Sequence, residues 1–232
     1  QAIEHIHYPT DKNQLYSARK RLIFDEFFMF IYNIRNLKDK NTEIHNRHIL
    51  EEPKEVKTLI NNLPYELTNA QKRTWEEIKR DISSTKVMNR LIQGDVGSGK
   101  TIIAFFALIT AALNNGQGAM MAPTEVLARQ HYDNLIELIK EHNINVNPVV
   151  LVGSMTAKEK RDAYKVIESG DADIIIGTHA LIQEKVNYNN LTMVVTDEQH
   201  RFGVRQREAI SEKGEHPHIM VMSATPIPRS LG

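Results

Sequence analysis

From residue 67 onwards, short runs of consecutive apolar residues alternate with longer stretches of amphipathic, helical spacing. The runs are apolar at nearly every position, which is typical of strands buried on both faces of a sheet. Strands that alternate with helices in this way predict an α/β domain with an open, mainly parallel sheet. The predicted strands are 90–93, 119–123, 148–152, 173–177, 193–196 and 219–222, and the predicted helices are 69–82, 102–113, 126–141 and 156–169.

The first 66 residues have a different pattern. Residues 13–37 carry aliphatic and aromatic side chains at spacings of three and four, which predicts one long amphipathic helix. Residues 51–62 predict a second, shorter helix with Pro53 near its start. We therefore expect a helical linker over 1–66 and an α/β domain over 67–232.

Composition narrows the class of protein only slightly. The 232 residues are 41% hydrophobic and 25% charged, and 29 basic residues balance 29 acidic ones. Any contact with nucleic acid must therefore come from individually placed residues and not from an overall basic field. The chain has no cysteine, and we recognise in it neither a signal-peptide pattern nor an apolar run of membrane-spanning length, which is compatible with the cytoplasm.

The segment from Gly94 to Thr101 matches G-x-x-x-x-G-K-[ST], a phosphate-binding loop. It lies between a predicted strand and a predicted helix, which is the setting that the motif requires. Backbone N–H groups at a helix start bind phosphate oxygens, and glycines let the backbone approach them closely. We expect Lys100 to reach the β- and γ-phosphates and Thr101 to ligate Mg²⁺. The expected nucleotide-binding residues are Gly94, Gly97, Ser98, Gly99, Lys100 and Thr101.

Two adjacent acids, Asp197 and Glu198, follow the apolar run 193–196. A carboxylate at a strand end beside the glycine loop can hold Mg²⁺, and a second can polarise the attacking water. We assign Asp197 to the metal and Glu198 to the water. Hydroxyl residues at the next strand end, Ser223 and Thr225, either relay the phosphate state through His200 or cap backbone groups of their own loop.

Two other strand ends carry hydroxyls at helix starts, around Thr124 and around Thr178 with His179. Such groups suit nucleic-acid phosphates, although each of them alone also fits a simple helix cap.

In order along the chain, these segments resemble motifs I, Ia, Ib, II and III of superfamily 2 helicases. Residues 63–71, 197–207 and 223–229 look like the corresponding segments of the RecG family of branched-DNA helicases. The transcription–repair coupling translocases are similar here, but Gln199 and His200 favour RecG. The resemblance is strong over 64–232 and less specific over 1–62.

The resemblance implies a RecA-like motor domain that uses ATP and Mg²⁺ to move on branched duplex DNA in recombination and repair in bacteria. It implies adenine recognition by Gln71 and DNA contacts by Thr124, Arg129, Thr178 and His179. It also implies a wedge domain before this segment and a second motor domain after it, so we expect this segment alone to be weakly active. A nucleotide-binding switch module without motor activity is the alternative from another functional class.

Overall fold

The computed structural model describes residues 11, 15–16, 19–21, 46–198, 210 and 213–224. Of the long helix expected over 13–37, the described residues 15–16 and 19–21 are helical, and the rest lies outside the described residues. By its contacts the chain divides into one unit over Gln1–Ile44 and another over His45–Gly232.

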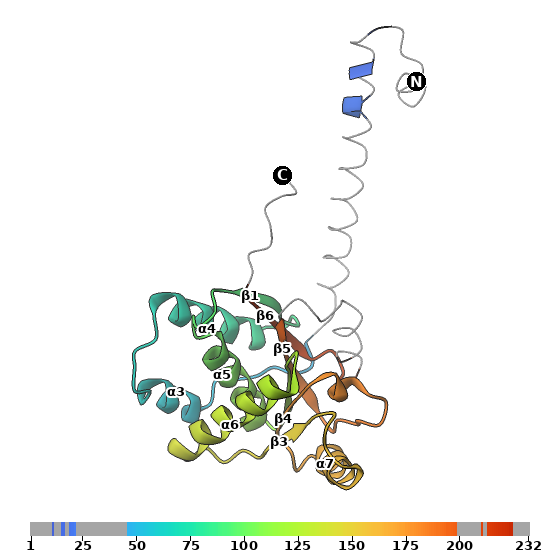
Figure 1. Cartoon of the computed structure of the whole chain (residues 1–232). Coiled ribbons are helices and arrows are strands. Elements are labelled where there is room, and N and C mark those ends of the chain that lie inside the picture. The colour runs from blue at the N-terminus through green and yellow to red at the C-terminus, as the bar shows by residue number, and fades with distance from the viewer. Residues whose placement is uncertain are drawn as a thin grey trace. The chain divides into compact units, whose positions relative to one another are not determined.

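The second unit is an α/β domain built on one six-stranded sheet (Figure 1). The strand order is β1-β6-β5-β2-β4-β3, and every neighbouring pair runs parallel. The mainly parallel sheet predicted from the continuous apolar runs is therefore confirmed. The strands are β1 (Asn89–Gln93), β2 (Gln117–Met121), β3 (Pro148–Leu151), β4 (Ile174–Gly177), β5 (Leu191–Glu198) and β6 (His218–Ser223).

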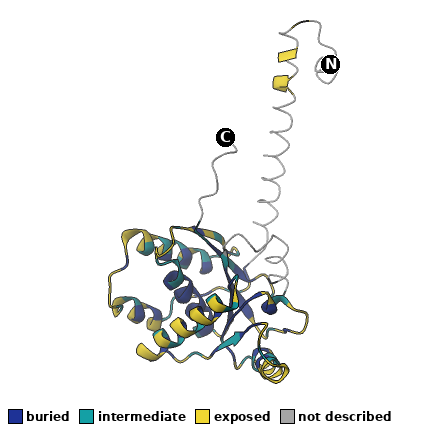
Figure 2. Cartoon of the chain, in the orientation of Figure 1, coloured by how far each residue is buried: buried dark blue, intermediate teal, exposed yellow. Residues whose placement is uncertain are grey.

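Helices cover both faces of this sheet, which is why its strands are apolar on both sides. One hydrophobic cluster joins alternate strand residues such as Met120 and Val195 to helices α3 to α6. The other joins the intervening residues, such as Val194 and Ile175, to α7 and a 3₁₀ turn. Figure 2 shows the strands dark blue between yellow outer helix surfaces. The helices are α3 (Lys54–Asn61), α4 (Asn69–Ile82), α5 (Lys100–Leu113), α6 (Glu125–Glu141) and α7 (Ala157–Ser169), and the turn is η1 (His179–Ile182).

Residues 46–62 belong to this second unit, although the sequence pattern placed a boundary between 66 and 67. Helix α3 buries Val56 and Leu59 completely in the main hydrophobic cluster. Glu52 accepts a hydrogen bond from Trp75 Nε1 at 2.9 Å, and the Trp75 ring packs edge-to-face on Phe106. The segment before α4 is thus part of the core.

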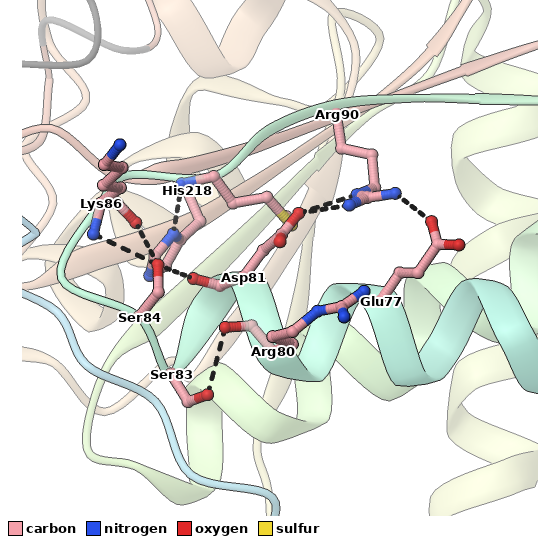
Figure 3. Close-up of polar contacts among 9 residues, drawn as sticks. Glu77, Arg80, Asp81, Ser83, Ser84, Lys86, Arg90 and His218 are labelled. Carbon is pink, nitrogen blue, oxygen red and sulfur yellow. Dashed lines mark hydrogen bonds and ion pairs between the residues drawn. The ribbon is translucent and has the colours of Figure 1, made fainter.

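Polar contacts fix α4 to the start of the sheet (Figure 3). Arg90 on β1 donates to Asp81 at 2.5 Å and to Glu77 at 2.5 Å, and both acids lie on α4. Next to this ion pair, Met88 N–H donates to Nδ1 of the buried His218 on β6 at 3.0 Å. These contacts hold the two strands whose ends form one side of the candidate site.

Candidate nucleotide site

The glycine loop joins the end of β1 to the start of α5, as its motif predicted. Gly97 and Gly99 have φ values of 81° and 77°, in the left-handed region that favours glycine. A Cβ on Gly99 would also lie 2.2 Å from Gln71 Nε2, so a side chain there would displace that amide. Lys100 is the first residue of α5, and the loop therefore presents the free N–H groups of a helix start.

Lys100 lies over its own loop. Its Nζ donates to the carbonyl oxygens of Gly94 at 2.6 Å and Asp95 at 2.8 Å, and Ser98 Oγ is 3.5 Å away. When a nucleotide binds, its phosphate oxygens would replace these carbonyl oxygens as acceptors for the Lys100 ammonium. The lysine also lines the cavities on either side of the loop, so it can face a ligand that occupies both.

The first cavity, of about 370 Å³, lies between the loop and the start of α4. Gln71 is on its wall and contacts the loop directly. Its Nε2 donates to Ser98 O at 2.9 Å, while its Oε1 accepts from Thr68 N–H at 2.8 Å in a capping box that starts α4. Both ends of the Gln71 amide are thus engaged with the protein. The lining residues are Thr68, Ala70, Gln71, Thr74, Ile92, Gln93, Gly94, Asp95, Ser98, Gly99, Lys100 and Ile103.

The second cavity, of about 290 Å³, brings together the lysine, Thr101 and Asp197. These residues come from segments about a hundred positions apart in the sequence. Asp197 lies within β5 in register with Met222, and its side chain is 22% exposed. The lining residues are Val96, Gly97, Lys100, Thr101, Leu127, Gln130, His131, Asn134, Asp197 and Ala224.

This second cavity suits Mg²⁺ by the chemistry of its donors. Among the described residues no cluster of three or more His, Asp or Glu side chains could hold a metal alone. Mg²⁺, however, takes one or two protein oxygens and completes its shell with water and phosphate. The hydroxyl of Thr101 and the carboxylate of Asp197 are such a pair among the residues that line this cavity.

Ser223 is placed between the loop and the acids. It is the Cα register partner of Gln93 in β1 and of Glu198 in β5, and its carbonyl accepts from Gly94 N–H at 3.2 Å. Glu198 is the last residue of β5. His200 and Thr225, the other two residues expected to take part in coupling, lie outside the described residues.

The segments that follow β2 and β3 meet through Glu125 and Ser154. Thr124 caps α6 by accepting from Leu127 N–H at 3.3 Å. Glu125 accepts from Ser154 N–H at 2.9 Å, and the hydrogen bonds from Ser154, aided by the nearby Arg129, lower the pKa of its carboxyl. Arg129 is exposed and donates to Ser154 Oγ at 3.4 Å. The exposed guanidinium is therefore held at the edge of the sheet where the loops converge.

The end of β4 carries Thr178 and His179. Thr178 is only 4% exposed, and its hydroxyl is buried without a hydrogen-bond partner among the described residues. It makes no side-chain cap on η1 either. A contact between this hydroxyl and a nucleic-acid phosphate therefore stays a prediction. The neighbouring His179 is exposed.

Comparison with known proteins identifies the family. Residues 68–231 match the DEAD/DEAH box helicase family. The chain belongs to this helicase family. The match begins at Thr68, the cap of α4, and includes the glycine loop, the acids of β5 and the end of β6.

Among helicases, the chain is similar to RecG proteins over its full length. It is 43% identical to the ATP-dependent DNA helicase RecG of Bacillus subtilis (strain 168), covering 100% of this chain and 34% of that protein. It is 45% identical to RecG of Thermotoga maritima, covering 97% of this chain and 29% of that protein. The chain thus spans about a third of the length of these relatives.

A solved structure of RecG bound to a three-way DNA junction is similar in fold, with a TM-score of 0.78 and 41% identity. The alignment covers 99% of this chain and 31% of that chain. A DEAD box protein from Methanococcus jannaschii shares the fold alone, with a TM-score of 0.60 at 22% identity over 81% of this chain and 52% of that chain. These neighbours confirm the RecA-like α/β fold. Within the described residues, no helix of the domain could cross a bilayer.

Sequence reasoning missed one residue of this helicase site. His131 on α6 lies within 2.9 Å of Asp197, measured from Nε2 to Oδ2. The only signal in the sequence was the spacing of Leu127, Gln130, His131 and Asn134, which lie on one face of a helix. That spacing gave no indication of which strand the face would meet.

Proposed function

We propose that the chain is the ATP-binding motor segment of an ATP-dependent DNA helicase that remodels branched DNA in recombination and repair. One observation carries the proposal: Lys100 and Thr101 of the glycine loop and Asp197 of β5 line the same cavity. Phosphoryl transfer from Mg-ATP requires an ammonium that binds the phosphates, together with a hydroxyl and a carboxylate that bind Mg²⁺.

The choice of DNA as partner rests on the relatives. Similarity over the whole of this chain to proteins named ATP-dependent DNA helicase RecG favours a DNA helicase over a transcription–repair coupling role. The similar structure with a three-way DNA junction supports the same substrate class. On this proposal residues 1–66 form the linker from a wedge domain, with 46–62 packed into the core of the first motor domain of residues 67–232, and the protein acts in the bacterial cytoplasm.

The proposed roles follow the geometry of the two cavities. The loop and Lys100 bind the phosphates, and Thr101 and Asp197 hold Mg²⁺, which would neutralise charge on the transferring phosphate. Glu198 orients and polarises the attacking water. Gln71 lines the cavity on the other side of the loop, where the adenine would lie. His200, Ser223 and Thr225 are the proposed relay from the phosphates to a neighbouring domain.

DNA contacts are proposed at the strand-end edge of the sheet. The exposed Arg129 and His179 supply side chains, and Thr124 and Thr178 supply backbone groups at the starts of α6 and η1. Because the chain has no net charge, these individual side chains and backbone groups, and not an overall positive electrostatic potential, would determine where DNA binds.

The nucleotide site is tested by Lys100→Ala. The variant should lose most of its affinity for ATP, since it removes the ammonium that faces both cavities, and its circular dichroism should stay parental. Equilibrium binding of a fluorescent ATP analogue measures this. Parental affinity in a correctly folded variant would refute the site.

The motor function is tested by ATP turnover of the full-length protein with forked, linear duplex or no DNA. A helicase of branched DNA should be stimulated most by the fork. Turnover that is indifferent to DNA would instead favour a nucleotide-dependent switch module without motor activity.

A further inference from the structure

His131 contacts the acid to which we assign the metal. Its Nε2 lies 2.9 Å from Asp197 Oδ2. An ionised carboxylate can only accept hydrogen bonds, so the imidazole donates from Nε2. The His131 side chain is 8% exposed and that of Asp197 is 22% exposed, so the contact is shielded from water on the histidine side.

The other ring nitrogen points to the purpose of this histidine. His131 Nδ1 is buried and has no hydrogen-bond partner among the described residues. Burying a polar atom without a hydrogen-bond partner costs free energy, so packing alone does not explain a histidine at this position. The contact with Asp197 is the hydrogen bond that this side chain makes in the described part of the chain.

The N-terminal half of helix α6 lines the second cavity. Leu127, Gln130, His131 and Asn134 lie on one face of the helix and line the cavity opposite Lys100 and Thr101. The same helix begins at Thr124, and its first turns carry Glu125 and Arg129 at the strand-end edge. One rigid element therefore reaches from the proposed DNA-facing edge to the proposed metal-holding acid.

We propose that His131 is a positioning residue: it orients the Asp197 carboxylate for Mg²⁺ and thereby ties the metal site to α6. This inference rests on the proposed function, because it assumes that Asp197 meets the metal. The hydrogen bond occupies one lone pair of Oδ2 and leaves the remaining lone pairs of the carboxylate for a cation. A displacement of α6 along β5 would change the direction of that carboxylate.

The test measures the Mg²⁺ requirement of nucleotide binding and not activity. A fluorescent ATP analogue is titrated with Mg²⁺ on the parental chain and on His131→Leu, which has no donor. Removing an outer hydrogen-bond partner of a metal ligand typically costs about 10–100-fold in metal affinity. We expect a rise of about tenfold in the Mg²⁺ concentration at half-saturation, at the lower end of that range. Affinity for the analogue in excess EDTA should stay parental.

Two variants separate positioning from packing. His131→Gln retains an N–H donor and should restore much of the parental Mg²⁺ dependence. His142→Gln, at the other end of the same helix, should leave it unchanged. A His131→Leu variant whose nucleotide affinity falls equally with and without Mg²⁺, or whose Mg²⁺ dependence is parental, overturns the inference.

An independent measurement covers the case in which His131→Leu does not fold. The imidazole nitrogen signals of His131 in the nucleotide-bound parental chain, assigned with His131→Gln, should shift in NMR when Mg²⁺ is added. Signals that do not move refute the link to the metal. Lys100→Ala then separates a failure of the nucleotide site from a failure of the positioning role. If Lys100→Ala loses nucleotide affinity while substitution of His131 leaves the Mg²⁺ dependence unchanged, the nucleotide site stands and only the positioning role fails.

Discussion

Asp197 and Glu198 are neighbours on β5, and the proposed chemistry gives them different tasks. Asp197 lines the cavity with Thr101 and is held by His131, as a metal ligand should be. A water-polarising acid needs its charge but not a metal bond. The two roles can therefore be separated by substitution.

In the full-length protein, Glu198→Gln should retain Mg-ATP and nearly abolish turnover, because the geometry survives while the water-activating charge is lost. Asp197→Ala should instead weaken binding that depends on Mg²⁺. Nucleotide binding and phosphate release measure the two effects. If Glu198→Gln hydrolysed ATP at the parental rate, the assignment of the two acids would be wrong.

Gln71 has a structural task beside any contact with adenine. It completes the capping box of α4 and donates to Ser98 O in the glycine loop. Loss of an N-cap side chain, here that of Thr68, costs about 0.5–2 kcal/mol, and Gln71 makes the reciprocal bond of the same box. We expect Gln71→Ala to lower the melting temperature and also to weaken nucleotide binding, because the loop loses a fixed contact.

Thr68→Ala is the matched control for Gln71, since it removes the other half of the same capping box and leaves Gln71 in place. It should lower stability by a similar amount with a smaller effect on nucleotide affinity. Equal losses of affinity in both variants would show that Gln71 acts only through the helix.

At the scale of elements, one buried histidine joins three segments. His218 on β6 accepts from Met88 N–H at 3.0 Å and donates from Nε2 to His48 O at 2.7 Å. The first contact requires the neutral ring, because Nδ1 can accept a hydrogen bond only when it carries no proton. Burial lowers the pKa of His218 below its ordinary value of 6.5, the charge of His48 acts in the same direction, and the His48 carbonyl and Asp81 oppose the shift.

A lowered histidine pKa means that the unfolded state binds the proton more tightly than the folded state does. Stability from His218 should therefore be present above pH 6.5 and decline as the pH falls towards the lower pKa of the folded state. Urea unfolding of the parent and of His218→Leu measures it. The parent should be more stable at pH 7.5, and the difference should shrink by pH 5. A constant difference would exclude His218 as the cause.

At the scale of the whole molecule, the described residues that line the two cavities include a lysine but no arginine. An arginine that reaches the transferring phosphate raises phosphoryl-transfer rates by about 10³–10⁵-fold. The chain also spans about a third of its relatives, 34% of the Bacillus subtilis protein. We expect the 232-residue chain to bind ATP but to hydrolyse it far more slowly than the full-length protein.

The measurement is ATP turnover by the chain and by the full-length protein, each with and without forked DNA. DNA binding by the chain should be weak and should fall with added salt. Rapid turnover by the chain alone that forked DNA stimulates would mean that its own residues complete the catalytic set.

The sequence by itself determined the elements and the local chemistry. Helix α4 spans Asn69–Ile82 as its pattern predicted, because cap, amphipathic face and end are all local signals. The glycine loop could also be predicted from the sequence, since its function depends on the spacing of residues within one short segment. The ends of the elements were predicted less accurately. Strand β5 continues to Glu198, two residues beyond the predicted strand, because its backbone hydrogen bonds extend past its apolar run.

Only the tertiary structure decided which distant residues meet. The strand order β1-β6-β5-β2-β4-β3 places Asp197 beside the glycine loop, and no local pattern specifies that order. The same packing buried Thr178 and brought His131 to Asp197. Periodicity shows that a face is buried, but the partner of that face depends on how whole elements pack, which is a property of the folded chain and not of any window of sequence.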